Sequence, residues 1–178
     1  MGGRDGTTGM GGITAESVKR LWDAQSAALV LYARQWCGSP EDVVQEAFLL
    51  LVRQAVPPEN PVGWLYRVVR NRAINAARSS GRQSRREAAV ALGSEPWFES
   101  PEGERLDAAA ATEALARLPV DEREVIVARL WGGLSLEEIS RVTGFSGSTV
   151  HRAYQRGMAA LRERWGATCL AKDAGMKS

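Results

Sequence analysis

Apolar residues recur every three or four positions over most of the chain, which is the spacing of amphipathic helices. The clearest case lies near the C-terminus. Ser135 and Glu138 have the spacing of a capping box that opens a short helix. Gly144 is expected to end that helix, because glycine adopts the left-handed cap conformation at little cost. Ser146 or Ser148 can then cap a second, longer helix.

The second helix of this pair separates an apolar face from a polar face. The apolar face holds Val150, Ala153, Tyr154, Gly157, Met158, Leu161 and Trp165. The polar face holds Ser148, Thr149, His151, Arg152, Gln155 and Arg156, with no carboxylate before Glu163. A helix, a glycine turn and a second helix with a donor-rich outer face are typical of a DNA-binding helix-turn-helix. An ordinary helical hairpin is the alternative.

The N-terminal third predicts two helices. Thr14 with Ser17 opens the first, which is broken at Gly38, and Ser39 with Pro40 opens the second as N-cap and first helical residue. The core stripe of the second helix is Val43, Val44, Ala47, Phe48 and Leu51. A different face carries Asp42, Gln45, Glu46 and Leu49. A solvated acidic face is one interpretation, but an exposed leucine among polar groups favours a surface that binds a partner.

A basic helix, or two in succession, is predicted after the Asn60-Pro61 cap. Its buried stripe is Trp64, Leu65, Val68, Val69, Ala73 and Ala76, and its polar stripe is Arg67, Asn71, Asn75, Arg78 and Arg82. Residues 61–90 hold seven arginines against one acid. Arginine attracts phosphate, and asparagine can read base edges, so the stripe indicates nucleic-acid binding. A solvated basic face is the alternative.

Composition divides the chain into two parts. At 178 residues, with 44% hydrophobic and 25% charged residues, it has room for one or two small soluble domains. The net charge is only +2, but residues 91–124 hold nine acids against three arginines. Residues 87–107 combine acids with glycine and proline and are read as a linker. Beyond it we expect a helix from Leu106 to Leu118, then a capping box of Asp121 and Glu124 that opens a helix through Trp131.

Several classes of protein are disfavoured by the sequence. No apolar run approaches a membrane span, and the N-terminus lacks the apolar region of a signal peptide. Cys37 and Cys169 need not pair, which suits a reducing cytoplasm. With His151 as the one histidine, neither a Ser-His-Asp triad nor a two-histidine metal site is expected, and no nucleotide-binding glycine motif is present. We therefore expect no enzyme activity, no cofactor and no metal.

Four segments together resemble the bacterial sigma-70 superfamily, and the two-domain brevity resembles its extracytoplasmic-function group. They are DVVQEAF (42–48), GWLYRVVRNRAINAAR (63–78), LPVDEREVIVARLWGGLSLEEIS (118–140) and STVHRAYQRGMAALRE (148–163). Each is weak alone, but their order makes the resemblance specific. Gly157 departs from the family's usual alanine, which implies a loss of helix propensity of about 1 kcal/mol.

The resemblance implies a role for each polar face. Asp42, Gln45, Glu46 and Leu49 would bind core RNA polymerase. Arg67, Arg70, Asn71, Asn75, Arg78 and Arg82 would bind the −10 promoter element, where Asn71 and Asn75 would face the non-template strand. Ser148, Thr149, His151, Arg152, Gln155 and Arg156 would enter the major groove of the −35 element. Core polymerase and promoter DNA are thus the expected partners, and an anti-sigma factor is left open.

The fold class expected is all-α, with two small helical domains joined by a flexible acidic linker. Residues 1–13 would be a disordered tail, 14–88 sigma domain 2, 89–107 the linker, 108–168 a four-helix sigma domain 4 with the helix-turn-helix, and 169–178 a tail. The expected function is a cytoplasmic transcription initiation factor. A stand-alone helix-turn-helix regulator is the alternative, with an RNA-binding or adaptor protein as a weaker one. The face from Asp42 to Leu49 discriminates these readings, because a free-standing regulator has no use for it.

Overall fold

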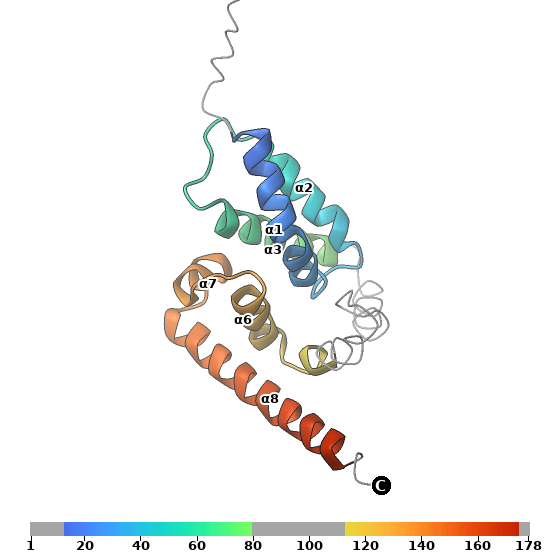
Figure 1. Cartoon of the computed structure of the whole chain (residues 1–178). Helices are drawn as coiled ribbons and strands as arrows, with labels where there is room; N and C mark the ends of the chain where they lie inside the picture. Colours follow the sequence, from blue (N-terminus) through green and yellow to red (C-terminus); the bar gives the residue numbers. More distant parts are fainter. Residues whose placement is uncertain (1–12, 80–112, 175–178) are drawn as a thin grey trace, which may run out of the picture.

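The protein is described here by a computed structural model, which covers residues 13–79 and 113–174, with side chains up to residue 163. Every regular element in these ranges is a helix, which confirms the all-α class. The N-terminal half contains α1 (Ala15–Ala33), α2 (Pro40–Val52) and α3 (Pro61–Ser79). The C-terminal half contains a helical segment at 113–116, then α6 (Val120–Leu130), α7 (Leu136–Thr143) and α8 (Gly147–Ala174) (Figure 1).

Some predicted boundaries differ from these helices or lie outside the described residues. The first helix ends at Ala33, before the predicted break at Gly38. Helix α8 continues to Ala174, past the domain boundary predicted at residue 168. The expected linker at 89–107 and most of the expected tail at 1–13 lie outside the described residues, as do Arg82 and the side chains of Trp165 and Cys169.

Most of the predicted helix starts are made by the expected caps. The Thr14 hydroxyl accepts from the Ser17 backbone N–H at 3.2 Å, and the Asn60 side chain accepts from Gly63 N–H at 2.9 Å. Both hydrogen bonds of the Ser135–Glu138 capping box form, and α7 ends at Gly144 with φ of 78°. These local signals are decisive because the first turn of a helix leaves backbone N–H groups that need acceptors.

One predicted cap is confirmed in position only, and one is wrong. Ser39 occupies the N-cap position of α2, but its side chain makes no capping hydrogen bond. The expected box of Asp121 and Glu124 does not form either, because Pro119 is the N-cap residue of α6. Glu124 instead points into the protein, where it is 2% exposed.

The buried stripe predicted for α2 is confirmed. Its five residues, Val43, Val44, Ala47, Phe48 and Leu51, are all buried against α1 and α3. On α3, Leu65, Val69 and Ala73 are buried, whereas Trp64, Val68 and Ala76 are half-buried. Tyr66 is a fully buried residue of α3 that the stripe did not include.

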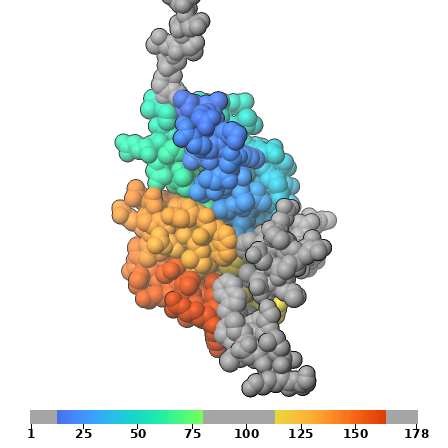
Figure 2. Space-filling model, viewed as in Figure 1, coloured from blue at the N-terminus to red at the C-terminus, as the bar shows by residue number. Residues whose placement is uncertain are grey.

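The two halves pack directly against each other. Buried side chains from both halves belong to one continuous apolar core. Helix α3 lies between the pair α1–α2 and the C-terminal helices, contacting α7, while α1 contacts α6 (Figure 1). The space-filling view shows the two halves meeting along a broad seam (Figure 2). The sequence predicted two domains joined by a linker but did not predict that they pack against each other.

A glycine allows α8 to lie close to α6. A Cβ atom added at Gly157 would come within 2.7 Å of Ile126 Cγ1, and both residues are buried. The low helix propensity of Gly157 is therefore offset by the close contact that it permits between the two helices.

We predict that Gly157→Ala lowers the melting temperature. Overpacking a core contact costs about 1–3 kcal/mol, which outweighs the gain of about 1 kcal/mol in helix propensity. Gly147→Ala is the matched control, because nothing lies within 4 Å of a Cβ at that position. Thermal unfolding followed by circular dichroism would measure both, and a Gly157→Ala variant more stable than the parent would contradict the close packing.

Candidate nucleic-acid interface

The polar stripe predicted on α3 forms an exposed surface. Arg67, Asn71, Asn75 and Arg78 are all exposed, on the side of the helix turned away from the buried Leu65, Val69 and Ala73. No carboxylate lies in α3. The stripe therefore offers charge for phosphate and amide groups for base edges on one continuous face.

Arg70 was predicted to bind DNA beside these residues, and in this structure it is not available to do so. Its guanidinium lies at the seam between the halves and bonds Glu124 of α6, with Nε to Oε1 at 2.6 Å and a longer contact to Oε2 at 3.5 Å. The Arg70 side chain is only 18% exposed. Spacing along α3 could not show this, because Glu124 is 54 residues away in the chain.

Tyr32 of α1 completes a polar cluster with Arg70 and Glu124, which we call the Glu124 cluster. The Tyr32 hydroxyl donates to Glu124 Oε1 at 2.6 Å in a fully buried position. Burial, followed by the negative charge of Glu124, raises the pKa of Tyr32 well above its usual value. Burial alone would lower the pKa of Arg70, but the hydrogen bond and charge of Glu124 outweigh burial and raise it.

Aromatic rings enclose the Arg70 side chain. The guanidinium carbon lies 6.0 Å from the ring centroid of Trp36 and 6.0 Å from that of Phe145. Trp36 follows α1, and Phe145 lies in the turn between α7 and α8. Arg70 therefore connects the basic helix with the turn of the predicted helix-turn-helix by cation–π contacts as well as by the ion pair.

That turn is held by local hydrogen bonds. The Ser140 hydroxyl donates to the Phe145 carbonyl at 2.6 Å, and the Phe145 N–H donates to Thr143 Oγ1 at 3.2 Å. At the start of α8, the Ser146 hydroxyl accepts from Thr149 N–H at 3.2 Å, so Ser146 is the N-cap. The predicted helix, glycine turn and second helix are thus confirmed, with Ser146 rather than Ser148 as the cap.

The outer face of α8 is exposed as predicted, although some of its side chains have internal partners. His151, Arg152 and Gln155 are exposed, as are Ser148 and Arg156, and Thr149 is half-buried. The hydroxyls of Ser148 and Thr149 lie 3.0 and 2.8 Å from the Ser146 hydroxyl, so they also take part in the cap. Arg156 donates to Glu122 of α6 at 2.7 Å.

A second polar contact joins the halves at two helix starts. Asn60 Nδ2 donates to Glu138 Oε1 at 2.5 Å, while Glu138 Oε2 accepts from the Ser135 N–H at 2.7 Å. The first residues of α3 and α7 are therefore tied through the side chains that cap them. These hydrogen bonds lower the pKa of Glu138, and the bond from the Ser135 backbone N–H contributes most.

The face of α2 predicted to bind a partner is exposed and more apolar than expected. Asp42, Gln45, Glu46 and Leu49 all face solvent, and Leu49 is 55% exposed. Val52, one turn further along α2, and Val56, which follows the helix, are 53% and 78% exposed. The sequence analysis missed both valines. Glu46 is also paired with Arg72 of α3, so its carboxylate helps to hold α2 to α3.

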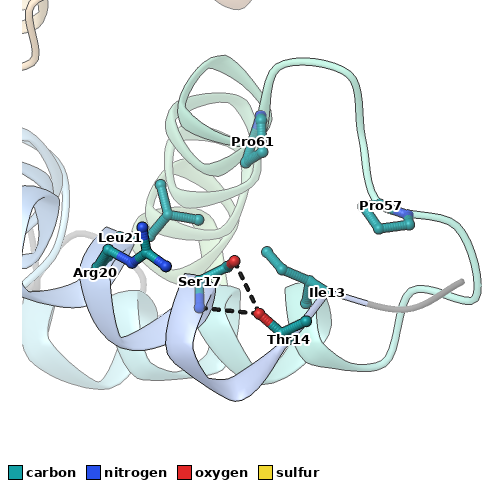
Figure 3. Close-up of a pocket in the computed structure, with 7 residues that line it drawn as sticks. All are labelled: Ile13, Thr14, Ser17, Arg20, Leu21, Pro57 and Pro61. Atoms are coloured by element: carbon teal, nitrogen blue, oxygen red, sulfur yellow. Dashed lines mark hydrogen bonds between the residues drawn. The ribbon is translucent and has the colours of Figure 1, made fainter. Parts of the chain in front are cut away.

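A shallow hollow of about 490 Å³ lies between the start of α1 and the segment before α3 (Figure 3). Its lining consists of Ile13, Thr14, Ser17, Arg20, Leu21, Pro57 and Pro61. Thr14 and Ser17 point towards each other and share hydrogen bonds (Figure 3). No residue predicted to bind DNA or a protein lines this hollow. Among the described residues, no group of three His, Cys, Asp or Glu could hold a metal, and no helix is long and apolar enough to cross a membrane.

Both halves of the chain match models of known families. Residues 21–83 match the model described as Sigma-70 region 2, and residues 108–161 match the model described as Sigma-70, region 4. The first range contains the α2 face and the α3 stripe. The second contains α6, the turn and the outer face of α8.

Individual relatives are more distant. The chain is 28% identical over 147 residues to a protein of Xanthomonas campestris pv. campestris named Probable RNA polymerase sigma factor RfaY. The match covers 76% of this chain and 36% of that protein, so the chain spans about a third of the length of this curated relative.

Two solved structures share the fold. One is the sigma factor RpoE from Bartonella quintana in complex with the anti-sigma factor NepR, with 21% identity, a TM-score of 0.66, and coverage of 86% of this chain and 98% of that chain. The other is CnrH in complex with the cytosolic domain of CnrY, with 23% identity, a TM-score of 0.56, and coverage of 86% and 90%.

We predict that Glu138→Gln costs roughly 1 kcal/mol at neutral pH, because it weakens charge-assisted hydrogen bonds at two helix starts. Since the pKa of Glu138 is lowered in the folded state, its contribution is present above its unfolded pKa and is lost as the pH falls through the folded value. The difference in melting temperature between parent and variant should therefore shrink below about pH 4.5. Glu137→Gln, at an exposed neighbouring carboxylate, controls for net charge. A difference that stays constant from pH 7 to pH 3 would contradict the assignment.

Proposed function

Because the chain belongs to the sigma-70 family, with regions 2 and 4 in the two-part arrangement of the extracytoplasmic-function group, we propose that it is a transcription initiation factor. In this role it binds core RNA polymerase and directs it to specific promoters. The observation that carries the proposal is the combination of three exposed faces in one chain: the α2 face, the α3 stripe and the outer face of α8.

The α2 face supports polymerase binding rather than a stand-alone regulator. Leu49, Val52 and Val56 form an exposed apolar surface beside the polar Asp42 and Gln45. Exposed apolar side chains rimmed by polar groups mark protein-binding surfaces. A regulator that acted through DNA alone would not need this second surface.

The two DNA-facing surfaces suit different steps. The outer face of α8 is a helix face of major-groove type, with Arg152 and Gln155 able to bond base edges of a −35 element. The α3 stripe carries Asn71 and Asn75 between Arg67 and Arg78, which suits capture of unpaired bases of a −10 element. Arginine then holds the backbone while asparagine reads the base.

The solved structures also support a protein partner for this chain. RpoE and CnrH were each solved with a bound protein, named in the case of RpoE as an anti-sigma factor. We propose that an anti-sigma factor also binds this chain, which acts in the cytoplasm and catalyses no reaction. Co-purification with core RNA polymerase and run-off transcription from genomic promoter fragments would test the function. A chain that binds one duplex site tightly without polymerase, and gives no transcript with it, would favour the stand-alone regulator.

We predict that Asp42→Arg with Leu49→Arg weakens polymerase binding by about thirtyfold or more, since losing an interface hot spot costs about 2 kcal/mol or more. Both side chains are exposed on α2, so the melting temperature should not change. Glu46 is left intact because it pairs with Arg72. Asp23→Arg on the exposed face of α1 is the control for charge reversal. Undiminished co-purification of the double variant would refute the assignment of this face.

We predict that Asn71→Ala or Asn75→Ala impairs promoter opening more than initial docking. Both side chains are exposed on the α3 stripe, so truncation leaves no cavity, and losing one good base contact costs about 1–3 kcal/mol. Arg152→Ala on α8 should instead weaken docking. Permanganate reactivity of unpaired thymines would report opening, and filter binding on duplex and pre-melted promoters would report docking.

The division of roles would be wrong under either of two results. One is normal opening of duplex promoters by the asparagine variants. The other is an Arg152→Ala variant whose transcription stays low even at high promoter concentration, where weak docking would be overcome.

A further inference from the structure

The basic stripe of α3 is incomplete in the closed chain, because one of its arginines is held by a carboxylate. Arg70 lies one turn from Arg67 and next to Asn71, at the edge of the exposed stripe. Two of its guanidinium nitrogens face the two oxygens of Glu124. A carboxylate and a phosphate present the same paired acceptors to a guanidinium. Glu124 therefore offers Arg70 the same pair of acceptor oxygens as a phosphate of the DNA backbone.

We propose that Glu124 is an intramolecular competitor of DNA. In the closed chain it holds Arg70 and joins the two halves, and on promoter binding Arg70 exchanges Glu124 for a phosphate of the DNA backbone. The proposal rests on the proposed function, because it requires α3 to bind DNA.

The closed arrangement cannot reach both promoter elements at once. Elements named −10 and −35 lie about 25 base pairs apart, which is roughly 85 Å along a duplex. In the closed chain Asn60, at the start of α3, is hydrogen-bonded to Glu138 of α7, and the recognition residues of α8 follow α7 directly. The 33 residues that connect Ser79 to Glu113 can span at most about 110 Å, which is enough for the halves to separate. Binding both elements therefore requires the seam to open.

The seam has the composition of a contact that can open. Its centre is the Glu124 cluster, in which Glu124 is 2% exposed and its hydrogen-bond donors among the described residues, Arg70 and Tyr32, come from the other half. A buried ion pair contributes less to net stability than to fixing one arrangement, since its attraction is offset by the cost of removing both charges from water. When the halves part, water solvates Glu124 and Tyr32, and a DNA phosphate replaces the partner of Arg70.

At the same seam, the backbone at Gly132 lies close to a side chain of α3. A Cβ atom added at Gly132, which follows α6, would come within 2.5 Å of the Tyr66 hydroxyl of α3. The Arg70 guanidinium also lies 6.0 Å from the ring centroid of Phe145, in the turn of the helix-turn-helix. Releasing Arg70 therefore also removes a contact between α3 and the turn that precedes the recognition residues.

The test replaces Glu124 by glutamine, which keeps an acceptor for Tyr32 and removes the charge that holds Arg70. The full-length parent and Glu124→Gln would be compared by small-angle X-ray scattering and by anisotropy with a mixed-sequence single-stranded 20-nucleotide DNA. We expect Glu124→Gln to have a larger radius of gyration than the parent and to bind the DNA about tenfold more tightly. If roughly one tenth of the parent chains are open, their apparent dissociation constant is raised about tenfold, and the variant removes that factor. Glu113→Gln is the matched control, because it removes a carboxylate that pairs only within its own half, with Arg117.

A double variant separates exchange of partners from simple opening. Arg70→Gln with Glu124→Gln should be as open as Glu124→Gln in scattering, yet lose most of the gain in affinity, because the freed arginine is absent. The charge swap Arg70→Glu with Glu124→Arg should restore the compact form without restoring DNA affinity. Circular dichroism would verify that each variant keeps its helix content.

Two results would overturn the proposal, and they can be told apart from failure of the proposed function. If Glu124→Gln matches Glu113→Gln in both measurements, Glu124 does not compete with DNA. If the double variant binds as tightly as Glu124→Gln, Arg70 is not the group that changes partner. If Glu124→Gln opens the chain but no variant binds DNA or polymerase, it is the proposed function that fails, and the exchange fails with it.

Discussion

The arrangement of the two halves depends on one buried carboxylate. Glu124 lies in α6, but the groups that donate hydrogen bonds to it, Arg70 and the Tyr32 hydroxyl, belong to the N-terminal half. A buried carboxylate without partners would be costly, so α6 is stable in this position only while α1 and α3 are beside it. Breaking such a pair from one side typically costs about 3–5 kcal/mol while the site stays buried. The interaction therefore specifies the closed arrangement more than it strengthens it.

The other contacts at the seam follow from that constraint. Gly132 lets the chain after α6 approach Tyr66, and Asn60 bonds the capping carboxylate of α7. Both DNA-facing surfaces lie outside the seam, with Asn71 and Arg152 exposed on their helices. Apart from Arg70, which is held at the seam, the closed chain thus keeps both recognition surfaces exposed while fixing the distance between them. A protein that must reach two separated DNA elements can use such a seam to couple binding to opening.

Local structure was largely predictable from the sequence, whereas contacts between the halves were not. The caps at Thr14, Asn60 and Ser135 and the turn at Gly144 were predicted because helix ends are determined by neighbouring residues. The exposed stripe of α3 followed from helical periodicity alone. Glu124 was misread as part of a capping box, since its spacing from Asp121 fits one and its true partners lie far away in the chain. The pairing of Arg70 with Glu124 was missed for the same reason, and Gly157 looked unfavourable because Ile126, the residue it accommodates, is 31 positions away.

The central claim is that the free chain is closed and that the halves separate when it joins polymerase on a promoter. Energy transfer between dyes on cysteines placed at the exposed Glu59 and Glu137, the neighbours of the hydrogen-bonded Asn60 and Glu138, would test it most directly, in a chain with Cys169 replaced by serine and the buried Cys37 left in place. The account predicts one short distance for the free chain and a distance longer by tens of ångströms in the transcribing complex. The same short distance in a complex that makes RNA would contradict it.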